Sequence, residues 1–161
     1  RPMSERIELR SRDAVAGCLI RRLIVPRIYF GAAWPSNGAP PVDVLAIDRD
    51  GVGDPHVVLI HANAADALGA IAQLNEITSP FRWIAFLRGT EDPSSATALE
   101  SQDVLYPASG AGRVGVIEVV KMSHSDLGAN IRVRAERFPV AAHHLATAFS
   151  RSHDANVEFG G

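Results

Sequence analysis

The sequence contains little cysteine and little lysine. Its one cysteine, Cys18, lies in an apolar, helix-like pattern, so no disulfide can form within the chain and we expect a core thiol in a reducing compartment. Lys121 is the only lysine among 16 basic residues, so arginine supplies almost all of the positive charge. With a formal net charge of -2, the chain as a whole does not attract nucleic acid, although a local basic face could still bind it.

Long apolar runs are also absent. No stretch of about 18 apolar residues occurs, so we expect neither a membrane span nor a membrane partner. The segment RPMSERIELRSRD is too charged for a secretory signal, and we therefore expect a cytoplasmic protein. Glycine-rich phosphate loops, Gly-x-Ser-x-Gly elbows and paired cysteine sites are missing as well, which leaves the common nucleotide, hydrolase and zinc signatures without support.

The residues that are present predict one α/β domain over residues 1–161. A hydrophobic content of 47% with 21% charged residues is typical of a soluble domain with a sizeable core. Apolar spacing predicts two helices, at 4–23 and 64–77, and four strands, at 27–34, 42–49, 56–62 and 82–88. A polar, turn-rich excursion follows at 89–112, then a hairpin of strands at 113–122 and 130–138, and a closing helix at 139–152. This order implies a mixed sheet.

An acid stands early in the apolar strand VDVLAIDR. Asp43 is flanked there by Val42 and Val44, and a buried carboxylate costs several kcal/mol unless it is paired, hydrogen-bonded or bound to a cation. It could accept hydrogen bonds from turn amides or pair with an arginine, or it could be the remainder of a metal site. The turn that follows is too short for a parallel crossover, so the strands at 42–49 and 56–62 are expected to pair as an antiparallel hairpin.

The element order, with VDVLAIDRDG followed by HVVLIH, resembles the restriction-endonuclease-like, or PD-(D/E)XK, superfamily of nucleases. The resemblance implies an Asp at the start of one strand and an acid-x-Lys triplet on the next. In that family the two carboxylates and the middle carbonyl hold a divalent metal, and the lysine helps to activate water. Asp43 matches the first acid, but Leu59, Ile60 and His61 occupy the triplet, so the second acid is missing and a histidine replaces the lysine. Because side chains alternate along a strand, Leu59 and His61 share a face with each other and can share it with Asp43 across the hairpin.

A second similarity lies in the helix that follows. The stretch ALGAIAQLNEI resembles a helix with a Gln-x-x-x-Tyr motif, in which Gln73 fits and Ile77 replaces the tyrosine. Asp66 lies seven residues before Gln73 on the same helical face and could supply the missing acid. Plainer interpretations remain open: His61 as a partly buried histidine bonded to a neighbour, and Gln73 as a solvent-exposed side chain.

These patterns lead to one expected function and two alternatives. We expect a nuclease-like domain that has lost catalysis, needs no cofactor, and binds nucleic acid or a protein partner. The first alternative is an active nuclease in which Asp43, Asp66, His61 and Gln73 surround a magnesium ion. The second is a structural homodimer or interaction protein.

Two further charged groups fall on the predicted C-terminal hairpin. Arg132 and Arg134 share one strand face and could form a nucleic-acid surface, although Glu136 on the same side dilutes the charge. Glu118 and Lys121 are three residues apart on a strand, so they point to opposite faces and do not make a displaced acid–lysine pair.

Overall fold

The computed structural model describes residues 5–23, 27–36, 38–47, 54–88, 96–122, 126–140, 145, 148–149 and 157–158. Its helices are α1 (Glu5–Leu23), α2 (Ala64–Leu74) and α3 (Ala96–Ala111). Its strands are β1 (Arg27–Ala33), β2 (Pro41–Ile47), β3 (His56–His61), β4 (Phe81–Leu87), β5 (Gly115–Lys121), β6 (Leu127–Val133) and β7 (Val157–Glu158). Within the described residues these strands form one sheet, in the order β6-β5-β4-β3-β2-β1-β7.

The sheet is mixed, as the sequence predicts. Strands β1, β2 and β3 form an antiparallel meander, and the β2–β3 pairing confirms the predicted hairpin. Strands β3, β4 and β5 are parallel, with α2 and α3 as the connecting helices that such crossovers need. The β5–β6 hairpin is antiparallel, which was also predicted, and it forms one end of the sheet.

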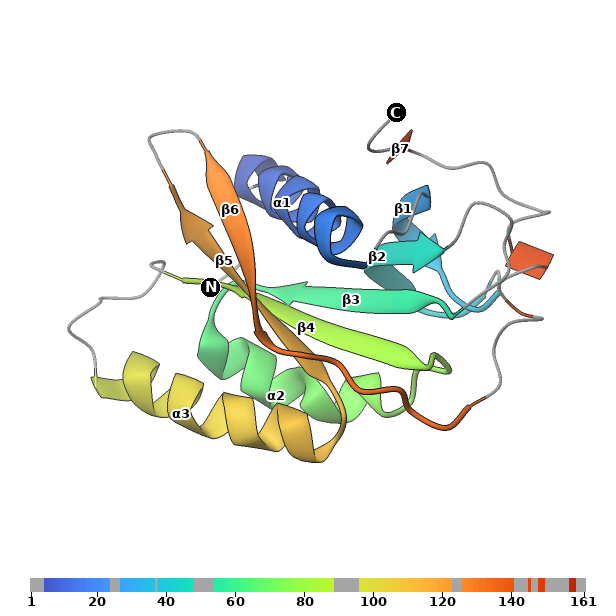
Figure 1. Cartoon of the computed structure of the whole chain (residues 1–161). Coiled ribbons are helices and arrows are strands. Elements are labelled where there is room, and N and C mark those ends of the chain that lie inside the picture. The colour runs from blue at the N-terminus through green and yellow to red at the C-terminus, as the bar shows by residue number, and fades with distance from the viewer. Residues whose placement is uncertain are drawn as a thin grey trace.

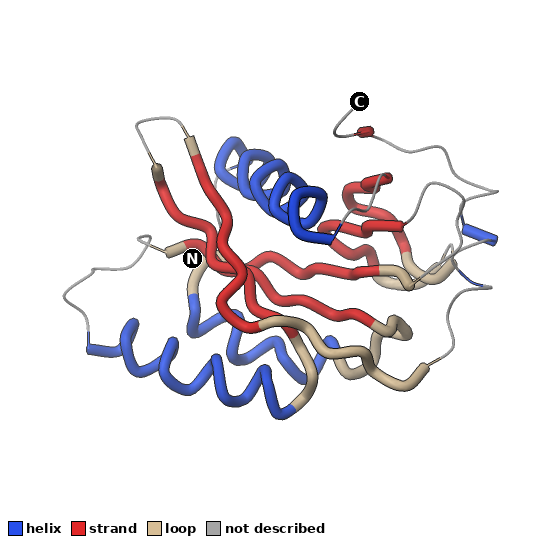
Figure 2. The backbone as a smooth tube through the Cα atoms, in the orientation of Figure 1, coloured by secondary structure: helices blue, strands red, loops and turns tan. Residues whose placement is uncertain are grey.

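Helices cover both faces of this sheet. Figure 1 shows α1 on one face and α2 with α3 on the other, and Figure 2 shows the same layers in the backbone trace. On the first face, Val15 and Leu19 of α1 pack in one apolar cluster with Val44, Val58 and Trp83. On the second face, Leu74 of α2 and Leu105 of α3 pack with Ile84 and Phe86.

Strand β4 is enclosed on both sides, and its one buried charge is hydrogen-bonded through both terminal nitrogens of its guanidinium. Arg82 is 1% exposed, and its guanidinium donates hydrogen bonds to the Leu74 carbonyl (3.2 Å), the Asn75 side-chain oxygen (2.9 Å) and the Gly112 carbonyl (2.7 Å). Its Cζ also lies 4.2 Å from the centroid of the Phe138 ring. Arg82 therefore satisfies carbonyl groups at the C-terminal ends of α2 and α3, where helices leave acceptors unpaired.

The predicted excursion at 89–112 is wrong where the structure describes it, because residues 96–111 form helix α3. The sequence hides this helix: its apolar residues lack a clear helical stripe, and Pro107 in its interior removes one backbone donor. Packing overrides that weak local preference, since Leu105 is fully buried against the sheet and Tyr106 packs beside it.

Element boundaries differ from the predictions by a few residues. Helix α2 ends at Leu74 rather than 77, and β6 spans Leu127–Val133 rather than 130–138. The predicted closing helix at 139–152 falls largely outside the described residues. Cys18 is buried in the core, as expected. No helix in the described part of the chain has the length and apolar character needed to cross a membrane.

Two glycines, Gly115 on β5 and Gly69 on α2, test the packing in opposite directions. A Cβ at Gly115 would lie 2.6 Å from Cζ3 of Trp83 and 2.7 Å from the backbone nitrogen of Ala135, so Gly115→Ala should destabilise the protein by about 1–3 kcal/mol or more. A Cβ at Gly69, inside α2, would meet nothing within 4 Å, and Gly69→Ala should stabilise by about 0.5–1 kcal/mol. Urea denaturation ranks both variants against the parent, and equal effects would contradict the packing described here.

His56 should make stability depend on pH. Its ring stacks on Phe81, with centroids 4.5 Å apart, and its Nδ1 accepts a hydrogen bond from Trp83 Nε1 at 3.1 Å. Burial lowers the pKa of His56 to about 4. The unfolded chain therefore binds a proton at His56 more tightly than the folded protein does. About 3 kcal/mol of stability that is present above pH 6.5 is lost as the pH falls toward 4. NMR titration of the His56 ring checks the pKa directly, and a value near 6.5 would contradict the burial.

Candidate functional site

Asp43 lies where the regular alternation of β2 breaks. Val42 packs in the cluster that holds Leu45, whereas Val44, only two residues later, packs in the cluster under α1. On β1, Gly31 lies between the residues that pair with Val42 and Val44, and its φ of 64° lies in the left-handed region that glycine adopts readily. This irregular position lets the Asp43 side chain approach the backbone of β3.

The carboxylate of Asp43 is occupied inside the protein. Its Oδ2 accepts a hydrogen bond from the backbone N–H of Ile60 at 2.6 Å, and its Oδ1 lies 3.8 Å from Nη2 of Arg12 on α1. The same guanidinium nitrogen donates to Glu8 at 3.3 Å. Burial raises the pKa of Asp43, against the lowering effects of the Ile60 N–H and the Arg12 charge. Of the interpretations open at the sequence level, the structure shows the amide-bonded, arginine-paired carboxylate.

His61 lies within electrostatic reach of two acids. Its Nε2 is buried and has no hydrogen-bond partner among the described residues. Burial lowers the pKa of His61, and the charges of Asp43 and Asp66 act in the opposite direction. The predicted hydrogen bond from His61 to a neighbour is therefore not formed by Nε2 within the described structure.

Leu59 and Gln73 lie in a different environment from Asp43. Asp43 turns toward α1, whereas Leu59 packs with the clusters on the α2 side of the sheet, so the predicted shared face is not formed. Gln73 is exposed, which agrees with its plainer interpretation. Both residues line a pocket of about 430 Å³ beside α2, together with Trp34, three prolines, Ala39, Glu76, Ile77 and Thr78.

The residues proposed for a metal site do not fit one. Asp66 is exposed in the first turn of α2, where its backbone N–H donates to the N-cap Asn63 at 2.8 Å. Among the residues that the structure describes, no group of three or more His, Cys, Asp or Glu side chains could hold a metal ion. A hard cation needs several oxygen ligands, and the oxygen it would need most, on Asp43, already faces an arginine.

A buried acid that the sequence prediction set aside is the centre of a polar cluster that joins three elements. Glu118 has a side chain only 2% exposed, and it accepts hydrogen bonds from Arg88 (3.4 Å), Arg132 (3.1 Å) and the Tyr106 hydroxyl (3.3 Å). Burial and the Glu118 charge raise the pKa of Tyr106. Lys121 is exposed, which agrees with the prediction that it does not pair with Glu118. The actual partners of Glu118 come from β6, α3 and the end of β4. A lone acid inside the apolar run VGVIEVV was the available signal.

Comparison with known proteins adds information about the fold. Neither a protein-family model nor a curated protein matches the chain. A solved structure, the SPO1766 protein of unknown function from Silicibacter pomeroyi, is similar with a TM-score of 0.52 and 19% sequence identity, over 89% of this chain and 85% of that chain. At this identity the similarity shows a shared fold, and it assigns no activity.

Substitutions at Asp43 separate its hydrogen bond from its charge. Asp43→Asn keeps an oxygen acceptor for the Ile60 N–H and should change stability by less than about 1 kcal/mol, whereas Asp43→Ala leaves that N–H without an acceptor and should cost about 1–3 kcal/mol. Because burial raises the pKa of Asp43, the folded state holds the proton more tightly than the unfolded chain. The parent should therefore lose stability relative to Asp43→Asn as the pH rises from the pKa that Asp43 has in the unfolded chain to its higher pKa in the folded protein.

Chemical denaturation at several pH values measures both effects. Asp103→Ala, at an exposed acid on α3, is the control and should be nearly neutral. An Asn variant as unstable as the Ala variant would show that the Arg12 charge, rather than the Ile60 hydrogen bond, determines the role of Asp43.

Proposed function

We propose that the chain is a nuclease-like domain that no longer performs metal-dependent phosphodiester cleavage and acts as a binding module. The proposal begins from the order of elements: α1, the meander β1–β2–β3, α2, and then β4 parallel to β3. This is the arrangement that the sequence resemblance to the restriction-endonuclease-like superfamily implies. A shared architecture does not carry a shared activity, so the activity has to be argued from the side chains.

The observation that carries the proposal is the contact between Arg12 and Asp43. In an active member of the superfamily, the first acid would face a divalent cation. Here a guanidinium lies 3.8 Å from Oδ1 and a backbone N–H engages Oδ2, so positive charge and hydrogen bonding from the protein itself satisfy the carboxylate. Leu59 stands in place of the second acid and packs on the α2 side of the sheet. The pairing with Arg12 and the leucine in place of an acid therefore both distinguish this geometry from that of a metal site.

The alternative of an active nuclease with Asp66 as a migrated ligand has weaker support. The observation in its favour is that the charges of Asp43 and Asp66 both raise the pKa of His61 against the effect of burial. Asp66 is nevertheless exposed, and the Asp43 carboxylate is turned to α1.

The binding module that we propose has either a nucleic acid or a protein as its partner. A protein partner includes a second copy of this chain. Light scattering beside a salt-dependent DNA-binding assay separates a homodimer from a nucleic-acid binder.

Calorimetric titration with Mg²⁺ and Mn²⁺ tests the loss of metal chemistry. The parent should bind neither ion tightly and should not cut duplex or single-stranded DNA in their presence. Asp43 is already paired with Arg12, and Leu59 stands in place of the second carboxylate that would complete a metal site.

Asp43→Asn and Asp103→Asn form a matched pair for this test. Both variants should behave like the parent in the titration and in the cleavage assay. Tight metal binding or metal-dependent cleavage that disappears in Asp43→Asn, and survives in Asp103→Asn, would overturn the proposal and return Asp66 to consideration as a ligand.

A further inference from the structure

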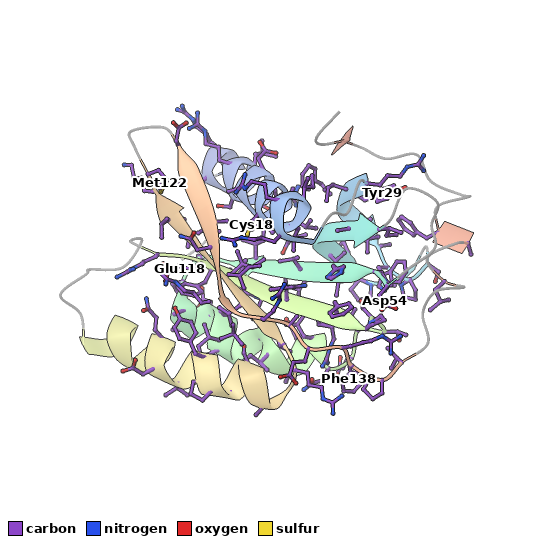
Figure 3. All side chains as sticks on the ribbon, viewed as in Figure 1. Cys18, Tyr29, Asp54, Glu118, Met122 and Phe138 are labelled. Carbon is purple, nitrogen blue, oxygen red and sulfur yellow. The ribbon has the colours of Figure 1, made fainter. Side chains whose placement is uncertain are left out.

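Two arginines converge on one buried oxygen at the β5–β6 side of the sheet. Arg88 Nη1 and Arg132 Nη2 both lie within 3.4 Å of Oε1 of Glu118. Figure 3 labels Glu118 on this side of the molecule, near the ends of β4 and β5. The carboxylate itself is 2% exposed, whereas the Arg88 and Arg132 side chains are 55% and 44% exposed. The anion is thus enclosed, and the two cations reach the surface.

Both guanidinium groups keep unused donors. Each guanidinium has five N–H groups, and within the described structure each makes one hydrogen bond, to Glu118. The three charges sum to one excess positive charge. Glu118 also accepts from the Tyr106 hydroxyl on α3, which fixes the carboxylate from a second side. The arginines are therefore held close together by a buried anchor, and their side chains remain about half exposed.

This arrangement suits a phosphate group. Arginine binds phosphate through paired, nearly parallel N–H bonds, and two guanidinium groups already oriented by protein contacts lose less side-chain entropy when a ligand arrives. Arg134, two residues beyond Arg132, is exposed as well. A chain of phosphates could therefore contact this surface at more than one point, whereas a single free phosphate would contact only the two arginines.

We infer that Arg88 and Arg132, positioned by Glu118, form a phosphate clamp for the sugar–phosphate backbone of a nucleic acid. The inference rests on the proposed function, because it names the ligand of that binding module. The clamp contacts phosphate and not base edges, so it binds without strong sequence preference and its affinity depends on salt.

Fluorescence anisotropy with a labelled single-stranded DNA oligonucleotide, and with the same sequence as a duplex, tests the clamp in the presence of EDTA. The double variant Arg88→Gln/Arg132→Gln should weaken binding by about tenfold or more, and the slope of log affinity against log salt should fall by about one. The matched control is Arg21→Gln/Arg22→Gln, which removes the same charge from exposed positions on α1. It should weaken binding by less than about threefold.

Glu118 becomes an unpaired buried charge in the double variant, which could unfold the protein. Arg88→Gln alone avoids this, because Arg132 and Tyr106 remain bonded to Glu118. This single variant should keep the parent's circular dichroism and melting temperature within a few degrees and still weaken binding by about threefold. Inorganic phosphate, added as a competitor, should displace the oligonucleotide only at high concentration.

Each contrary result has a distinct meaning. No oligonucleotide binding by the parent, or binding of inorganic phosphate alone, overturns the nucleic-acid assignment. Equal losses in the two double variants overturn the clamp in favour of general charge attraction. Metal-dependent cleavage by the parent overturns the proposed function while leaving the clamp in place, because the binding assay contains no free divalent metal.

Discussion

Burial of β4 on both faces is the constraint on which the other features depend. Every residue from Arg82 to Leu87 is buried, because α1 covers one face of the sheet and α2 with α3 cover the other. In such an interior a polar group must find its partners within the protein, since an unpaired charge would cost more than the fold can supply. The positions of the buried charges therefore show where the layers are joined.

Two buried charges perform this joining at separate places. Arg82, at the start of β4, bonds to carbonyl groups at the ends of α2 and α3, and it holds both crossover helices to the strand between them. Glu118, on β5, joins the end of β4 to α3 and β6. Arg82 has no exposed surface to offer a ligand, whereas the partners of Glu118 do. A buried charge with hydrogen-bonded partners is thus structural at Arg82, whereas at Glu118 its arginine partners reach the surface.

Local patterns in the sequence predicted most of the frame, but not the contacts that decide the site. The β2–β3 hairpin followed from the shortness of its turn, and α1 and α2 from their apolar spacing. Helix α3 escaped prediction because its helical preference comes from packing of Leu105 rather than from its own sequence. Strict strand alternation placed Asp43 on the face of Leu59, and the break near Gly31 invalidates that step. The Glu118 cluster required knowledge of which elements are neighbours in space.

The helix that completes the core also occupies the candidate metal position. Arg12 lies on α1, one turn before Val15 and Ala16, whose burial holds that helix against the sheet. The guanidinium therefore stands beside Asp43 as a consequence of how the first face is closed. Its removal would leave a partly buried carboxylate with one hydrogen bond, from the Ile60 N–H, and without its arginine partner. A metal site at Asp43 would require removing Arg12 and adding an acid that reaches the α1 side of the sheet, because Leu59 packs on the other side. The packing of α1, which brings Arg12 to Asp43, therefore also determines which ligands that carboxylate can accept.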